Sequence, residues 1–89
     1  MAETLMINPA EMERLATVFN QQAEAVASIM STIDATLAGT TWVGGRARQF
    51  EQNWNGAFKR NLVALQTALV ENGSVINRES AAGRAALDL

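Results

Sequence analysis

The side chains that could take part in catalysis are few and scattered in this chain. It contains no cysteine and no histidine, so it has no thiol nucleophile and no imidazole base, and the usual structural zinc sites are excluded. Carboxylates such as Glu11, Glu51 and Glu79 could act as acid or base, but no spacing brings two of them together in one pocket. The glycine-rich stretch 39–45 lacks the Gly-Lys-Ser/Thr ending of a phosphate-binding loop. We therefore predict that the protein is not an enzyme and has no catalytic residue, no metal site and no cofactor.

The one stretch of unusual composition is the segment 39–45, Gly-Thr-Thr-Trp-Val-Gly-Gly. Its three glycines disfavour a continuous helix by about 1 kcal/mol each relative to alanine, so the chain is expected to bend here. Trp42 is an unusual residue for a bend, because a large indole left in water wastes apolar area. We expect it either to plug the open end of a helical bundle or to be covered by a binding partner, and both roles can hold together.

A long amphipathic helix is predicted before the bend, over about residues 9–38. Asn8 can cap it, Pro9 suits its first position, and Glu11 completes a pattern that resembles a capping box. Gly39 is a natural stop. Its large apolar residues follow a seven-residue repeat in two adjacent rows, the first of Met12, Phe19, Val26 and Ile33 and the second of Leu15 and Ile29.

A second amphipathic helix is predicted over about residues 46–80, followed by a flexible C-terminal tail. Gly56 and Gly73 lie inside this pattern and weaken it locally. One face of this helix carries its large apolar side chains, Phe50, Trp54, Phe58, Leu62, Leu65, Leu69 and Ile76. The chain is thus expected to be one all-α domain over residues 1–89, a helix-turn-helix hairpin.

A single hairpin cannot hide stripes this wide, so we predict that two hairpins pack into a four-helix bundle. At 89 residues a monomer is only marginally stable, and the absence of cysteine removes disulfides as support. Gln22 and Asn61 could set the register by pairing across the seam, or could simply be solvated. The predicted dimer interface consists of Met12, Leu15, Phe19, Val26, Ile29, Ile33, Phe50, Trp54, Phe58, Leu62, Leu65 and Leu69.

Charge and hydropathy narrow the choice of partners. The net charge is −2, and every basic residue except Arg14 follows the bend, so the composition is not that of a nucleic-acid-binding protein. The acidic first half and the more basic second half are expected to attract each other weakly. Met1–Asn8 has no basic region and an apolar run of only three residues, so we predict synthesis in the cytoplasm without a cleavable signal peptide.

Trp42, Val43 and Gly44 resemble the Trp-X-Gly motif of the WXG family, small helical hairpins that type VII (ESX) secretion systems export. The length, the motif at the bend, and Phe50 and Trp54 after it also resemble that family. The resemblance implies a dimer exported by a membrane-associated ATPase, with the bend at Trp42, Val43 and Gly44 as part of the recognition surface. It also implies a Tyr-X-X-X-Asp/Glu signal in the C-terminal tail of at least one partner.

This sequence departs from the family pattern in that tail, since it has no tyrosine, and Ile76 and Ser80 stand where the tyrosine and the acid are expected. We therefore expect a paralogous WXG-type partner that carries the signal, which favours a heterodimer over a homodimer. The chain would then be a co-substrate or export chaperone of that partner. The alternatives are an amphipathic hairpin that acts on membranes after export, which the acidic charge disfavours, and a cytoplasmic helical adaptor.

Overall fold

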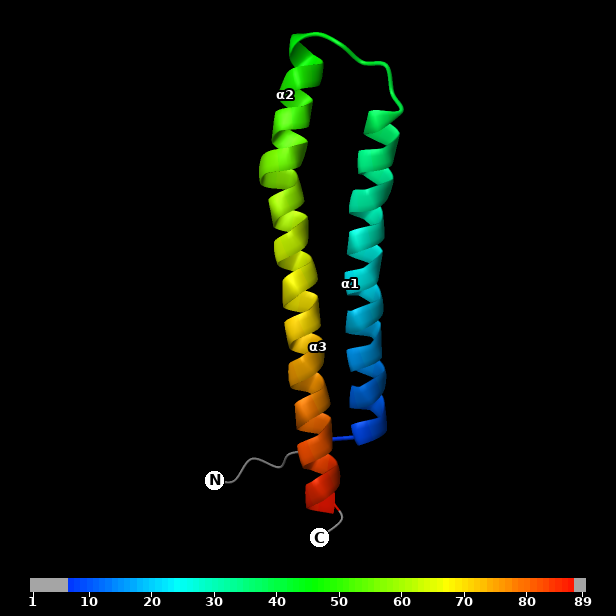
Figure 1. Ribbon diagram of the computed structural model, residues 1–89. Helices are drawn as coiled ribbons and strands as arrows, with labels where there is room; N and C mark the ends of the chain where they lie inside the picture. The colour runs from blue at the N-terminus through cyan, green and yellow to red at the C-terminus, as the bar shows by residue number, and fades with distance from the viewer. Residues whose placement is uncertain (1–6, 88–89) are drawn as a thin grey trace.

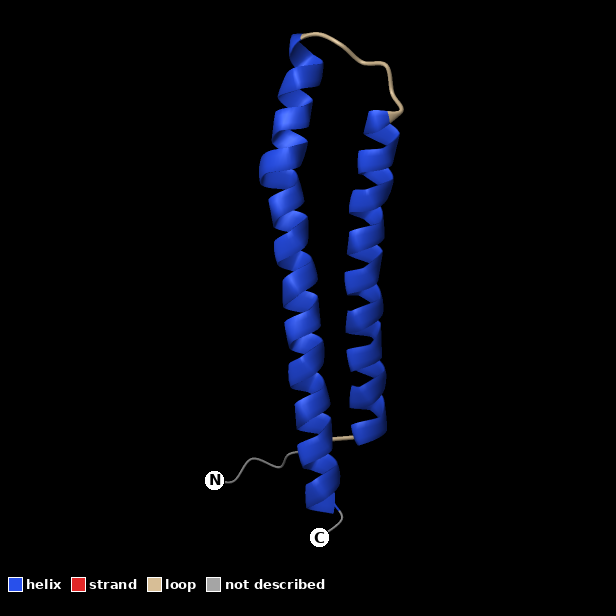
Figure 2. Ribbon diagram, viewed as in Figure 1, coloured by secondary structure: helices blue, strands red, loops and turns tan. Residues whose placement is uncertain are grey.

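The computed structural model describes residues 7–87, which form two antiparallel helical arms joined at a bend (Figure 1). The first arm is helix α1, Pro9–Ala38. The second arm runs without a break through α2, Gly45–Asn53, the π-helical turn η1, Trp54–Phe58, and α3, Lys59–Leu87. Within the described range every element is helical (Figure 2), which confirms the prediction of an all-α hairpin. The molecule is long and flat, with extents of 66 × 26 × 13 Å.

The ends of α1 follow from local signals in the sequence. The side-chain oxygen of Asn8 accepts a hydrogen bond of 3.1 Å from the backbone N–H of Glu11, and Pro9 occupies the first turn. At the other end the backbone N–H of Gly39 still donates to the carbonyl of Ala35 at 3.1 Å, after which the helix ends. Both bounds agree with the capping pattern.

The two arms approach each other closely in the half of the hairpin far from the bend, because small side chains meet there. Ala16 and Ala23 of α1 are buried, as are Gly73 and Ser80 of α3. A Cβ atom on Gly73 would stand 3.5 Å from the backbone oxygen of Ala16, which shows how little space separates the arms. We refer to this line of contact between the arms as the seam.

Helix α3 continues to Leu87, so it extends past residue 80, where we predicted the helix to end and a flexible tail to begin. The hydroxyl of Ser80 donates to the backbone oxygen of Pro9 at 3.0 Å. The guanidinium of Arg84 binds Oε1 of Glu13, at 2.9 Å from Nε and 2.8 Å from Nη2. Ile7 also packs here, since a Cβ atom on Gly83 would stand 3.1 Å from its Cγ2. Residues 1–6 of the N-terminal segment and the last two of the predicted tail lie outside the described residues.

The second predicted helix contains a π turn that the periodicity did not indicate, because η1 inserts one extra residue between α2 and α3. The backbone N–H of Lys59 donates to the carbonyl of Trp54, five residues earlier, which is the hydrogen bond of a π turn. An extra residue rotates the following helix by about 100°. As a result Leu62 and Leu69 lie half-buried in the seam, while Phe58 and Leu65 are exposed.

Candidate functional site

The bend holds its tryptophan and valine at the surface. Trp42 is 46% exposed and Val43 is 86% exposed. Gly44 has φ 116°, a backbone conformation that side chains with a Cβ rarely adopt, and its carbonyl accepts the first helical hydrogen bond of α2, from Arg48 at 3.1 Å. The sequence Trp-Val-Gly therefore presents two apolar side chains and then starts the next helix.

Trp42 is covered on one side by a residue of α2. Its ring lies 5.5 Å from that of Phe50 between centroids, with the planes tilted by 46°, which is a favourable geometry for an aromatic pair. The two rings line an open hollow of about 520 Å³ together with Arg46, Gln49 and Asn53. The corner of the hairpin is thus an aromatic surface with polar edges, a composition typical of a protein-binding site.

The predicted dimer-interface residues fall into three groups. Val26 and Trp54 are buried within the hairpin itself, at 7% and 5% exposure. Another six are half-buried, namely Met12, Phe19, Ile33, Phe50, Leu62 and Leu69. The remaining four are between 46% and 49% exposed, namely Leu15, Ile29, Phe58 and Leu65.

These four exposed side chains share one face of the hairpin. On the opposite face Asn20 of α1 and Val70 of α3 line a common groove. At 100° per residue, Leu15 and Ile29 lie on the other side of the seam from Asn20, and Leu65 lies on the other side from Val70. Phe58 is seven residues before Leu65 and so shares its side. We call this surface of Leu15, Ile29, Phe58 and Leu65 the outer face.

Gln22 and Asn61, which could have paired across the seam, are both exposed. Ile76 is half-buried and Ser80 is buried, at 1% exposure, so both positions of the expected tail signal lie within α3 against α1. The predicted acid and base candidates Glu11, Glu51 and Glu79 are each exposed. In residues 7–87 no three acidic side chains gather in a way that could hold a metal ion.

One cluster of polar contacts between the arms was missed by the sequence analysis. Asp34 of α1 accepts a hydrogen bond of 2.7 Å from the indole Nε1 of Trp54, and its second oxygen lies 2.7 Å from Nζ of Lys59. The hydrogen bond with Lys59, and to a smaller extent the hydrogen bond with Trp54, hold the pKa of the Asp34 carboxyl below its ordinary value. Partial burial opposes this shift. The sequence does contain a signal for this cluster, because a tryptophan on an apolar stripe needs an acceptor for its indole N–H.

Comparison with known proteins leaves the family of this chain open: no family model, no curated protein and no solved structure matches it. Of the helices described here, none combines the length and the apolar composition needed to cross a bilayer.

Proposed function

We propose that this chain is a secreted helical hairpin that a type VII (ESX) pathway exports as a dimer, with a WXG-type partner completing a four-helix bundle. The observation that carries the proposal is the small core of the single hairpin. Within residues 7–87 the buried apolar side chains are Ala16, Ala23, Val26, Ala47 and Trp54, of which three are alanines. Such a core buries too little apolar area to offset the conformational entropy of a chain this long.

The outer face supplies the missing apolar area. Its four side chains are about half exposed, and each large apolar side chain contributes roughly 1.5–3 kcal/mol when it is fully buried. The flat shape of the hairpin, 13 Å thick in its shortest direction, lets a second hairpin lie along the whole face. A partner of the same architecture therefore fits both the length and the chemistry of this surface.

In this proposal the bend is part of the surface that the export pathway recognises. Trp42 and Val43 remain at the surface, and an exposed aromatic anchor beside polar residues is a common binding hot spot. The positions expected for a tail signal, Ile76 and Ser80, face α1 and offer neither a tyrosine nor an acid. The proposal therefore assigns the tail signal to the partner chain, so that a dimer travelling as a unit presents the partner's tail together with this bend.

The proposal is tested first by oligomeric state. The chain is expressed alone and together with the product of any neighbouring reading frame that encodes a similar short protein, and its mass is measured by analytical ultracentrifugation. A stable dimer, mixed or with itself, is expected. A compact monomer with a cooperative unfolding transition under both conditions would contradict the dimer.

Export is tested in a host that carries the pathway. The chain and its partner should appear in the medium, and deletion of the pathway ATPase should retain both in the cells. Unchanged export would rule out this pathway, and absence from the medium in every strain would favour the cytoplasmic adaptor. Leakage of liposomes at mildly acidic pH, caused by the purified chain, would instead favour action on membranes.

A further inference from the structure

The carboxylate of Asp34 binds two side chains that a regular α-helix would hold apart. Trp54 is the first residue of the π turn and Lys59 follows its last residue, and the side-chain nitrogen of each lies 2.7 Å from an oxygen of Asp34. Residues five apart in an α-helix point about 140° away from each other. The π hydrogen bond from the N–H of Lys59 to the carbonyl of Trp54 removes most of that difference. The contacts of Asp34 with both residues are therefore compatible with the π turn and not with a regular helix.

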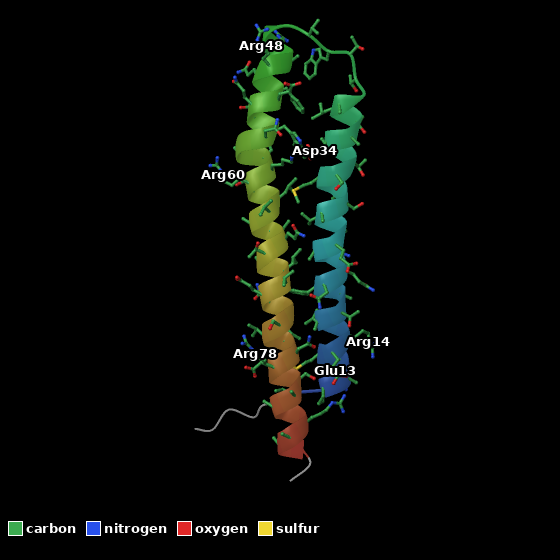
Figure 3. All side chains as sticks on the ribbon, in the orientation of Figure 1. Glu13, Arg14, Asp34, Arg48, Arg60 and Arg78 are labelled. Carbon is green, nitrogen blue, oxygen red and sulfur yellow. The ribbon has the colours of Figure 1, made fainter. Side chains whose placement is uncertain are left out.

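The backbone of the segment on the bend side of this turn stands farther from α1 than the backbone of α3 does. No Cα atom of α2 or η1 lies within 8 Å of one in α1, and the two ribbons diverge toward the bend (Figure 1). The side-chain polar contacts between the arms gather in two clusters at opposite ends of the hairpin, where Figure 3 labels Asp34 and Glu13. Among the side-chain polar contacts between the arms within residues 7–87, only those of Asp34 lie on the bend side.

We propose that Asp34 is a positioning residue for the bend: by holding the π turn it fixes the rotation of α2, and with it the direction in which Trp42 and Phe50 face. If the π turn became a regular α-helical turn, α2 would rotate relative to α3 by about 100°. That rotation would carry Ala47, which is 4% exposed, away from its buried position. The rotation is a property of the single hairpin, while its consequence for recognition rests on the proposed function of the bend.

Thiol accessibility measures this rotation directly, because the chain has no cysteine of its own. Single cysteines are placed at Ala47 in α2 and, as a reference, at Ala23 in α1, which is 3% exposed. Each is combined with Asp34→Ala, and alkylation rates are measured under native conditions. The rate at position 47 is expected to rise about tenfold, the effect of losing hydrogen bonds to a charged group, while the rate at position 23 stays the same.

The control is Glu13→Ala, which removes an equally short ion pair between the arms at the opposite end, with Arg84. It should leave both thiols protected. Continued protection of position 47 in Asp34→Ala would overturn the proposal. If Asp34→Ala exposes both positions together, the chain has unfolded globally, and the milder Asp34→Asn decides: it must expose position 47 alone, and equal or unchanged rates at the two positions overturn the proposal.

An export assay with the same variants separates the two ideas. Reduced export of Asp34→Ala, with normal export of Glu13→Ala, supports both the positioning of the bend and its role in recognition. Selective exposure of position 47 with normal export keeps the positioning role and overturns the recognition role of the bend. An unchanged thiol pattern overturns the positioning role whatever the export result.

Discussion

The ring of Trp42 packs against the ring of Phe50, one turn inside the next helix, so the bend carries its own aromatic support. This contact holds the indole in place while nearly half of its surface stays open to solvent. A residue held in this way can bind another protein without first paying the entropy of ordering a flexible loop.

The first prediction concerns Trp42→Ala. The variant loses an aromatic contact worth about 0.5–1.5 kcal/mol, so the melting temperature of the proposed dimer should fall by only a few degrees. Export should fall by about tenfold or more, as expected for truncation of a binding hot spot. The control is Val63→Ala, which shortens another exposed apolar side chain, on the face of the hairpin opposite the outer face. This variant should be exported normally. Large destabilisation with normal export of the folded protein would instead give Trp42 a purely structural role.

The second prediction separates the outer face from the seam. Leu65→Asp places a charge on a side chain that is 48% exposed in the hairpin, so the hairpin should stay helical while the proposed dimer dissociates. Leu62→Asp places the same charge in the seam and should unfold the hairpin itself, because an unpaired charge there costs several kcal/mol. Circular dichroism and ultracentrifugation distinguish the two results.

The control for this pair is Val63→Asp. It adds the same charge close to both positions in sequence, but on the face of the hairpin opposite the outer face. It should leave both the helix content and the dimer intact. Dissociation by Val63→Asp but not by Leu65→Asp would show that the interface lies on the opposite face and would contradict its assignment to the outer face.

The third prediction concerns the close contact at Gly73. Alanine there gains up to about 1 kcal/mol of helix propensity, and its Cβ would stand 3.3 Å from the exposed side-chain oxygen of Asn20, which can move aside. Gly73→Ala should therefore be neutral or slightly stabilising. Gly73→Leu should destabilise by about 1–3 kcal/mol, because its side chain must push the arms apart. Urea unfolding checks both, and equal tolerance of both substitutions would contradict the close approach of the arms.

The fourth prediction is a pH dependence that comes from Asp34. Its pKa is lowered in the folded hairpin, mainly by Lys59 and also by the indole of Trp54. The ionised carboxylate therefore stabilises the fold at pH values above the ordinary aspartate pKa of 3.8, and this contribution disappears as the pH falls through the lower folded-state value. Asp34→Asn should be less stable than the native chain at pH 7.

The difference between the two chains should shrink below pH 3.8 and vanish once Asp34 is protonated in both the folded and the unfolded state. Thermal unfolding of the native chain and of Asp34→Asn between pH 7 and pH 2 measures this difference directly. A difference that stays constant over the whole range would show that the charge of Asp34 contributes nothing to stability.

The sequence by itself determined the features that depend on neighbouring residues. The start of α1 follows from Asn8 and Pro9, its end follows from Gly39, and the bend follows from the glycines around Trp42. Each of these acts through backbone hydrogen bonds or dihedral preferences within a few residues, so no knowledge of the other arm is needed. The all-helical class follows in the same way from the spacing of apolar residues.

Only the tertiary structure decided how the apolar stripe of the second arm is divided. By spacing alone Phe58, Leu62 and Leu65 belong to one face, whereas the π turn places Leu62 in the seam and leaves the other two exposed. The turn is held by Asp34, which is far from Trp54 in sequence and comes from the other arm. The length of α3 depends in the same way on distant partners, since Ser80 and Arg84 bind Pro9 and Glu13. Contacts between arms set both features, and periodicity within one arm carries no information about them.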